Sequence, residues 1–281
     1  QDPAGNLYWS YTTTLVKTDS QGKLLKKVDV ANHHGDLCYV EGQLFVAVNY
    51  GQFNNPLGNA DNEILAYHAD TLQLKARHKV PQVKHGAGGI AHHQGKFIVV
   101  GGLPEGITEN YLYEYDDSFR FQKRHVLKSG WTRLGIQTAA FADGVWWFGC
   151  YGNSLLKAST DFELLGRYRF DCGYGIAQAP GGGLLTAGGN CSADEGCSGW
   201  ITKRQTQKLV SSQLQQPITR IGFGSCVKQQ NPAPLFSNIL DYQSELFLFM
   251  GDNIYGDSED MSVLKAKYKV LGEKNGFKKL R

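Results

Sequence analysis

Hydrophobic residues in the first two hundred positions fall into short runs separated by glycine turns. Four segments share one layout, in which a strand, a turn containing glycine and a mostly apolar strand follow each other: DLCYVEGQLFVAV, IAHHQGKFIVVGG, TAAFADGVWWFGC and IAQAPGGGLLTAG. The turn glycines are Gly42, Gly95, Gly144 and Gly182. An apolar second strand of this kind is typical of a strand that is buried on both faces.

A second repeat lies between these segments. TDSQGKLLKK, ADTLQLKAR, DDSFRFQKR and TDFELLGR each place an aspartate at a turn before an alternating strand. An aspartate suits this position because its carboxylate can accept hydrogen bonds from the backbone of the turn. The aspartates are Asp19, Asp70, Asp117 and Asp161, and the same spacing reaches Gln205 in TKRQTQKLVSS, a degenerate fifth copy.

Together the two repeats give four short strands in every ~40–50 residues, which is the blade unit of a β-propeller. The predicted fold class is therefore mainly β, with a five-bladed β-propeller over residues 1–208. A β-sandwich would not keep a fixed period and a β-helix has a shorter one, so the propeller is favoured over both. The count is one strand short, because the inner turn of the first blade is predicted at residues 1–6. The innermost strand of that blade either lies upstream of Gln1 or is lacking.

One face of the predicted propeller collects long loops and polar side chains. Because strands alternate in direction, loops between the second and third strands emerge on the same side as the links to the next blade. The longest insertions (51–62, 101–110 and 188–199) are loops of the first kind. Loops on a rigid scaffold often carry binding groups, so this face is a candidate ligand or metal site. Its candidate residues are His34, Asp36, His85, Arg133 and Asp171, which alternatively only shape and solvate the blade junctions.

Composition narrows the class of protein. The chain of 281 residues is 41% hydrophobic, which is enough for a sizeable core. Its 29 basic and 26 acidic residues form no nucleic-acid footprint, and no apolar run approaches the ~18–20 residues of a membrane span. Among six cysteines, Cys191 and Cys197 flank a short polar loop. They form either a disulfide, which would imply an oxidising compartment, or two free thiols.

A different pattern follows residues 209–218, a polar stretch predicted to be a linker. Two apolar strands suited to a parallel sheet are predicted at residues 220–224 (RIGFG) and 246–250 (LFLFM). Helices are predicted over residues 232–242 and 258–271, and Ser258 is the predicted N-cap of the second helix. In this β-α-β-α unit, functional side chains are expected at the carboxyl ends of the strands. Cys226, Asp252 and Tyr255 lie there, and their anionic groups suit a highly charged metal such as ferric iron. The alternative is a buried structural thiol and a turn-capping aspartate.

The combination of FGSC with GDNIYGD resembles the PhoD-type alkaline phosphatase and phosphodiesterase family, a branch of the binuclear metallophosphoesterases. The resemblance covers about residues 219–281. It implies that Cys226 and Tyr255 bind iron (Fe3+) and that Asp252 bridges the iron to a second divalent metal such as Ca2+. It also implies hydrolysis of phosphate mono- or diesters by a periplasmic or secreted protein. Asn253 stands where the family commonly has tyrosine, a change that leaves the ligand set untouched.

The family also draws on later asparagine and histidine motifs, yet all eight histidines of this chain lie at or before residue 125. We therefore expect a truncated phosphoesterase segment that is inactive alone. Two functions stay open. The first is a metal-dependent phosphoesterase with an accessory propeller that binds substrate, a cell-surface polymer or a partner. The second is a ligand- or partner-binding propeller without catalysis of its own, and a catalytic propeller is a third alternative that rests on fold analogy alone.

Overall fold

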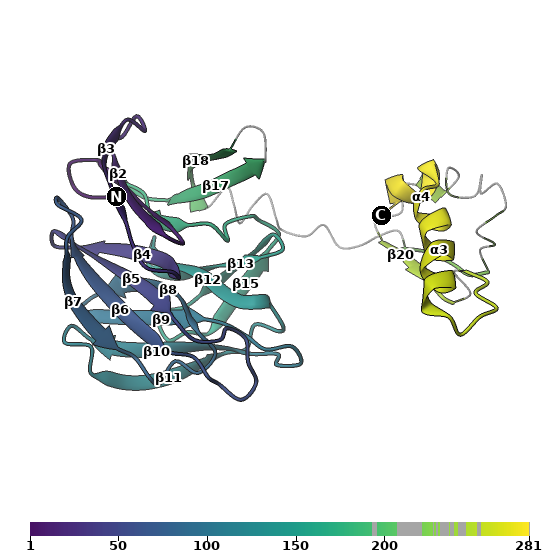
Figure 1. The fold of residues 1–281 in the computed structure, drawn as a ribbon, viewed down its shortest axis with the longest axis horizontal. Coiled ribbons are helices and arrows are strands. Elements are labelled where there is room, and N and C mark those ends of the chain that lie inside the picture. The colour runs from purple at the N-terminus through teal and green to yellow at the C-terminus, as the bar shows by residue number, and fades with distance from the viewer. Residues whose placement is uncertain are drawn as a thin grey trace. The chain divides into compact units, whose positions relative to one another are not determined.

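The structure is a computed structural model that describes residues 1–192, 196–206, 221–226, 228, 230, 236, 239–240, 246–251 and 254–280. The chain divides into two compact units, Gln1–Gln213 and Leu214–Arg281 (Figure 1). The predicted linker at 209–218 lies outside the described residues.

The first unit is a five-bladed β-propeller, as the repeats predicted, and each blade is an antiparallel sheet. Three blades have four strands, numbered from the innermost strand outward. Blade 2 contains β4 (His34–Val40), β5 (Gln43–Asn49), β6 (Asn62–His68) and β7 (Leu74–Lys79). Blade 3 contains β8 (Ala87–His93), β9 (Lys96–Gly101), β10 (Asn110–Asp116) and β11 (Phe121–Leu127). Blade 4 contains β12 (Arg133–Ala142), β13 (Val145–Tyr151), β14 (Ser154–Ala158) and β15 (Leu164–Tyr168).

Blades 1 and 5 each have three described strands. Blade 1 contains β1 (Leu7–Tyr11), β2 (Thr14–Thr18) and β3 (Leu24–Asp29), and blade 5 contains β16 (Ile176–Gln178), β17 (Leu184–Ser192) and β18 (Gly196–Arg204). The polar, mostly exposed β3 matches the outermost strands β7, β11 and β15. Strand β1 therefore occupies the second position of its blade, and no described strand pairs with its channel-facing edge. Among the described residues, blade 1 thus consists of the three strands β1, β2 and β3.

Hydrophobic clusters between neighbouring blades form the core. One cluster joins blades 1 and 2, a second joins blades 2 and 3, a third joins blades 3 and 4, and a fourth joins blades 4 and 5. The apolar second strands of the sequence repeat supply both sides of these clusters, because alternate residues of β5 face different neighbouring blades. This explains why the second strands carry almost no polar residues.

In the turns before the outermost strands, a side-chain oxygen accepts hydrogen bonds from the backbone, as predicted. The residue that supplies this oxygen is not always the predicted aspartate. Asp19 accepts hydrogen bonds of 2.9 Å from the N–H groups of Gln21 and Lys23. In blade 3 the equivalent acceptor is Asp116 rather than Asp117, and in blade 4 it is Ser159 rather than Asp161. The repeat is thus real, and its register differs from the predicted one by one or two residues.

The predicted grouping of loops on one face is confirmed for blades 2 and 3. Asn54, in the loop after β5, donates its N–H to the carbonyl of His85, in the link between β7 and β8. The Oδ1 atom of Asn54 accepts a hydrogen bond of 2.9 Å from Leu103, in the loop after β9. These three connections therefore pack against one another.

The second unit contains the parallel pair β19 (Ile221–Gly224) and β20 (Leu246–Phe249), followed by α3 (Met261–Gly272) and α4 (Asn275–Leu280). The parallel pairing agrees with the predicted β-α-β order, although only residues 236, 239 and 240 of the helix at 232–242 are described, all helical. Asp260, not Ser258, is the N-cap of α3, and its carboxylate accepts a hydrogen bond from Ser262. The N-cap thus lies two residues later than predicted, because both residue types are good caps. These few elements do not by themselves show a phosphoesterase domain. No described helix is long and apolar enough to cross a membrane.

Candidate functional site

A large cavity lies at the centre of the propeller, next to the open edge of β1. Its volume is about 1340 Å³, and ordinary ligand pockets have roughly 300–1,000 Å³. Residues of β1, of the innermost strands β4, β12 and β16, and of β17 line it. The cavity occupies the region that an innermost strand of blade 1 would fill, so its position follows from the strand count.

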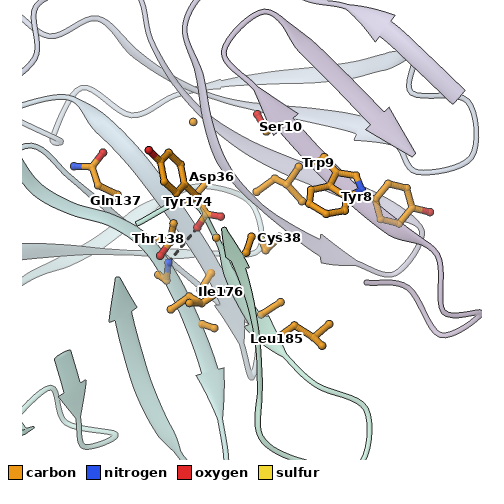
Figure 2. A pocket seen from close by; sticks show the side chains of 18 of the residues that line it. Tyr8, Trp9, Ser10, Asp36, Cys38, Gln137, Thr138, Tyr174, Ile176 and Leu185 are labelled. Atoms are coloured by element: carbon orange, nitrogen blue, oxygen red, sulfur yellow. Dashed lines mark hydrogen bonds between the residues drawn. The ribbon is translucent and has the colours of Figure 1, made fainter. Parts of the chain in front are cut away.

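Asp36 of β4 is the most unusual residue of this cavity (Figure 2). Its carboxylate accepts a hydrogen bond of 3.1 Å from the N–H of Ala139 and further backbone hydrogen bonds from Leu37 and Ile90. The innermost strands of blades 2, 3 and 4 therefore converge on one carboxyl group. Protein atoms surround this group on most sides, while part of the residue stays open to the cavity. Burial raises the pKa of Asp36 to about 8 against the effect of its N–H donors.

Aromatic and small side chains form other parts of the wall. Tyr8 donates its hydroxyl to Asp2 at 2.8 Å, and the indole N–H of Trp9 donates to Thr18 at 3.1 Å. The hydroxyl oxygen of Ser10 is buried without a described hydrogen-bond partner.

The structure places His34 beside the cavity together with Asp36, but the His34 ring is already engaged. Its Nδ1 lies 2.6 Å from the carbonyl oxygen of Ala31, and its Nε2 lies 2.7 Å from the hydroxyl of Tyr67. The residue is 3% exposed, and burial lowers the pKa of its ring. Both ring nitrogens of His34 are therefore engaged within the protein.

The other three predicted face residues lie outside the cavity lining. His85 is 3% exposed, its Nδ1 lies 2.9 Å from the carbonyl oxygen of Asn55, and its ring stacks on Tyr111. Arg133 and Asp171 are exposed. The described residues contain no group of three or more His, Cys, Asp or Glu side chains arranged to hold a metal. The structure thus supports the blade-junction role for His85 and brings only Asp36 and His34 to the cavity.

Sequence reasoning missed several residues of the site, among them Ser10, Gln137 and Tyr174. They lie in three different blades, so no local motif could connect them. The sequence pattern that could have indicated the cavity is the strand count of blade 1. Blade 1 has three described strands, and the cavity lies beside its strand β1.

In the second unit, the parallel pairing brings together the two predicted metal-binding segments. The N–H of Cys226 donates to the carbonyl of Gly251 at 3.3 Å, and the N–H of Met250 donates to the carbonyl of Gly224 at 2.8 Å. Cys226 has a φ of 62°, a left-handed conformation that is uncommon outside glycine and often occurs at functional sites. Asp252 lies outside the described residues, although it follows Gly251 directly in the chain.

The chemistry of the two described candidates fits a metal site. Cys226 is exposed, so its thiol is accessible. The chain around Tyr255 is held by Lys267, whose ammonium group donates to the carbonyls of Tyr255 and Gly256 at 3.0 and 2.6 Å. A cysteine and a tyrosine on adjoining strand ends can supply a thiolate and a phenolate, which are suitable ligands for ferric iron.

Five radial blades place the first unit in the class of β-propeller proteins. The chain matches no family model, and it matches no curated protein. Among solved structures, it is similar to the glutaminyl cyclase of Myxococcus xanthus with 14% identity, a TM-score of 0.46, and coverage of 62% of this chain and 76% of that chain. It is also similar to the computationally designed Ika4 protein with 11% identity, a TM-score of 0.33, and coverage of 55% and 85%. Likenesses this distant carry no conclusion about function.

Proposed function

We propose that the propeller is a ligand-binding module whose ligand occupies the cavity beside Asp36. The observation that carries this proposal is the Asp36 carboxyl, which is deeply surrounded by protein and still borders a large cavity. No cation pairs with it among the described residues. Burial of such a group is costly, and a ligand that brings a hydrogen-bond donor to it would offset the cost.

The wall of the cavity restricts the chemistry of the ligand. Tyr8, Trp9 and Tyr174 offer aromatic surface, which suits an apolar or aromatic body. Asp36 requires a donor such as an amide N–H or an ammonium group. A ligand that stabilises the carboxylate form will bind more tightly as the pH rises towards the raised pKa of about 8.

Benzylamine tests this proposal because it joins an aromatic ring to an ammonium group. We expect the melting temperature of the purified chain to rise with benzylamine concentration at pH 8, since a ligand that binds only the folded state stabilises it. The rise should be smaller at pH 6, where the carboxyl of Asp36 is protonated. Differential scanning fluorimetry measures both effects.

Benzyl alcohol and the variant Asp36→Asn are the matched controls. Benzyl alcohol has the same ring without the positive charge, and the variant keeps the side-chain shape without the carboxylate. The rise in melting temperature should be much smaller with benzyl alcohol on the wild type, and much smaller with benzylamine on the variant. An equal rise with benzyl alcohol, or in the variant, would contradict a binding role for Asp36.

We also propose, as a second function, that residues 219–281 belong to a metal-dependent phosphoesterase of the PhoD type. The supporting observation is the hydrogen bond from Cys226 to Gly251, which aligns the ends of β19 and β20. Cys226, Asp252 and Tyr255 would hold iron (Fe3+), with a second divalent metal such as Ca2+. The substrate would be a phosphate mono- or diester, and the protein would be periplasmic or secreted.

In this proposal each residue has a separate task. Metals held by these residues would supply Lewis-acid activation of the phosphate. The left-handed backbone at Cys226 turns the chain at the strand end. Lys267 holds the carbonyls of Tyr255 and Gly256, and so fixes the loop that carries the phenol.

Metal analysis of the purified chain by mass spectrometry tests this second function. We expect about one iron per chain in the wild type, and its loss in both Cys226→Ala and Asp252→Ala, because each variant removes an anionic ligand. Asp257→Asn is the matched control, since Asp257 is exposed in the same loop and has no predicted ligand role. Iron that survives both ligand substitutions, or a wild type without iron, would refute the assignment.

A further inference from the structure

The loop-side end of blade 4 is covered by only a short connection. Strands β13 and β14 are joined by Gly152 and Asn153 alone. The matching connections run from 50 to 61 in blade 2 and from 102 to 109 in blade 3. Blade 4 therefore has no long loop of its own above its strand ends, and the side chains that lie there keep access to solvent.

Three aromatic side chains lie at this end of blade 4. Trp131, in the link from β11 to β12, is 46% exposed, and Tyr174, in the link from β15 to β16, is 64% exposed. Tyr151 ends β13, and its ring centroid lies 6.5 Å from that of Tyr174. Large side chains of the turns on the opposite face are instead buried, as in Leu72, Phe119 and Phe162. Exposed aromatic rings grouped in this way are typical of interaction sites.

Hydrogen bonds hold the backbone of the two links that carry these rings. The guanidinium of Arg167 donates to the carbonyls of Trp131 and Ser129 at 2.9 and 3.4 Å. In the second link, the hydroxyl of Thr138 donates to the carbonyl of Cys172 at 2.9 Å. The rings thus stand on a fixed backbone, which lowers the entropy cost of binding a ligand.

Two side chains of opposite charge stand beside the rings. Arg133 lies directly opposite Tyr151 across β12 and β13, and Asp171 precedes Tyr174 in the same link. Both are exposed, and among the described residues neither charged group has an ion-pair or hydrogen-bond partner. We name the whole group the blade 4 shelf: Trp131, Arg133, Tyr151, Asp171 and Tyr174.

We propose that the blade 4 shelf binds a neutral saccharide chain. A pyranose ring has an apolar C–H face, which packs well on the flat face of a tyrosine or tryptophan ring. Its hydroxyl groups both donate and accept hydrogen bonds, so they can pair with the guanidinium of Arg133 and with the carboxylate of Asp171 together. This function goes beyond the ligand proposed beside Asp36 and does not depend on it.

The charges of the shelf disfavour other kinds of ligand. Because Arg133 and Asp171 balance each other, the shelf offers no cationic surface to an acidic polymer and no anionic surface to a basic peptide. A purely apolar partner would bury both charged groups without hydrogen bonds, which is costly. A neutral saccharide covers the rings and satisfies the charged groups at the same time.

Isothermal titration calorimetry on the purified chain tests this proposal. The probes are three neutral hexasaccharides that differ in the shape of the chain: cellohexaose, maltohexaose and mannohexaose. We expect at least one of them to bind with a Kd below about 1 mM. Trp131→Ala and Tyr174→Ala should each weaken that binding by at least about tenfold, since tryptophan and tyrosine commonly supply most of the affinity of a binding surface.

Trp200→Ala is the matched control, because Trp200 is 53% exposed on β18 of blade 5 and lies outside the shelf. It should keep the affinity of the wild type. Tyr174 also borders the cavity beside Asp36 (Figure 2), so Asp36→Asn is measured in parallel and should bind the saccharide normally. Unchanged melting temperatures of the Trp131 and Tyr174 variants will show that these exposed substitutions leave the fold intact.

Three results would overturn the proposal. The first is that none of the three hexasaccharides binds. The second is binding that survives both Trp131→Ala and Tyr174→Ala, or that is lost in Asp36→Asn, since either places the saccharide elsewhere. The third is preference for a charged or peptide probe, measured with hexagalacturonate and with hexaproline, because aromatic surfaces also bind proline-rich chains. If benzylamine fails to bind while a hexasaccharide binds the shelf, the function proposed for Asp36 fails and the shelf proposal stands.

Discussion

The variant Phe97→Ala is expected to lower the free energy of unfolding of the propeller by about 3–5 kcal/mol. Phe97 of β9 is 2% exposed, and its ring centroid lies 4.6 Å from that of Phe45 and 4.5 Å from that of Phe119. It therefore joins blade 2 to blade 3 at the centre of their shared cluster. Truncation removes the contacts of the ring and leaves a hole that close-packed strands cannot refill. Urea unfolding followed by circular dichroism gives the difference.

Phe121→Ala is the matched control for this change. Phe121 is 39% exposed on the outermost strand of blade 3, where its ring keeps one edge contact with Tyr115 at 5.6 Å. The expected loss is about 1 kcal/mol, the usual value of one aromatic pair. Equal losses for the two variants would show that the junction between blades 2 and 3 does not carry the stability assigned to it.

The second large effect concerns the dependence of stability on pH. The folded protein keeps the Asp36 proton up to a pKa of about 8, whereas the unfolded chain loses it near the ordinary value of 3.8. Between these values the folded state binds more protons, so the free energy of unfolding falls as the pH rises, by up to about 1.4 kcal/mol per pH unit. Above about pH 8 this dependence ends. Asp36→Asn removes it, so its advantage over the wild type should grow from pH 5 to pH 8.

Thermal unfolding of both proteins at several pH values measures this difference. For a propeller of this size, each pH unit in the window should widen the gap in melting temperature by ~3–5 °C. Buried histidines such as His34 and His85 have lowered pKa values and act in the opposite direction below about pH 6.5. They contribute equally to both proteins, so the difference isolates Asp36.

Asp143→Asn provides a contrasting carboxyl group. Asp143 accepts hydrogen bonds from Thr206 and from the N–H of Gly183, and these hold its pKa below the ordinary value. Its stabilising effect is therefore present above pH 4 and is lost as the pH falls further.

Parallel stability curves for Asp36→Asn and the wild type between pH 5 and 8 would refute the assignment of a raised pKa to Asp36.

Much of the fold was predictable because local patterns repeat. Glycine turns and apolar second strands defined the blades, and the short first blade was visible as a missing strand. The register of the polar turns was less certain, since Asp116 and Asp117 are both aspartates and only the turn geometry selects the first. Likewise Ser258 and Asp260 are both good N-caps, and the sequence does not rank them.

The candidate site was harder to predict because it depends on distant contacts. His34 and His85 carry the residue type expected of a ligand, yet each has a ring nitrogen beside a backbone carbonyl, and His34 uses both nitrogens. Asp36 was identified among the candidates, but the sequence could not show that three blades would direct N–H groups at it. The pairing of Cys191 with Cys197 stays a prediction. The two residues stand opposite each other across β17 and β18, and their side chains lie outside the described residues.

The four hydrophobic clusters lead from blade 1 to blade 5 in sequence order, and among the described residues none of them joins blade 5 back to blade 1. At that junction a Cβ on Gly199 of β18 would lie 3.7 Å from the hydroxyl oxygen of Tyr11, so the contact there is made by side chains of β1. Among the described junctions, the one between blades 5 and 1 therefore has the least apolar contact. Local opening of the propeller on heating is expected to begin there, before the other four blade contacts separate.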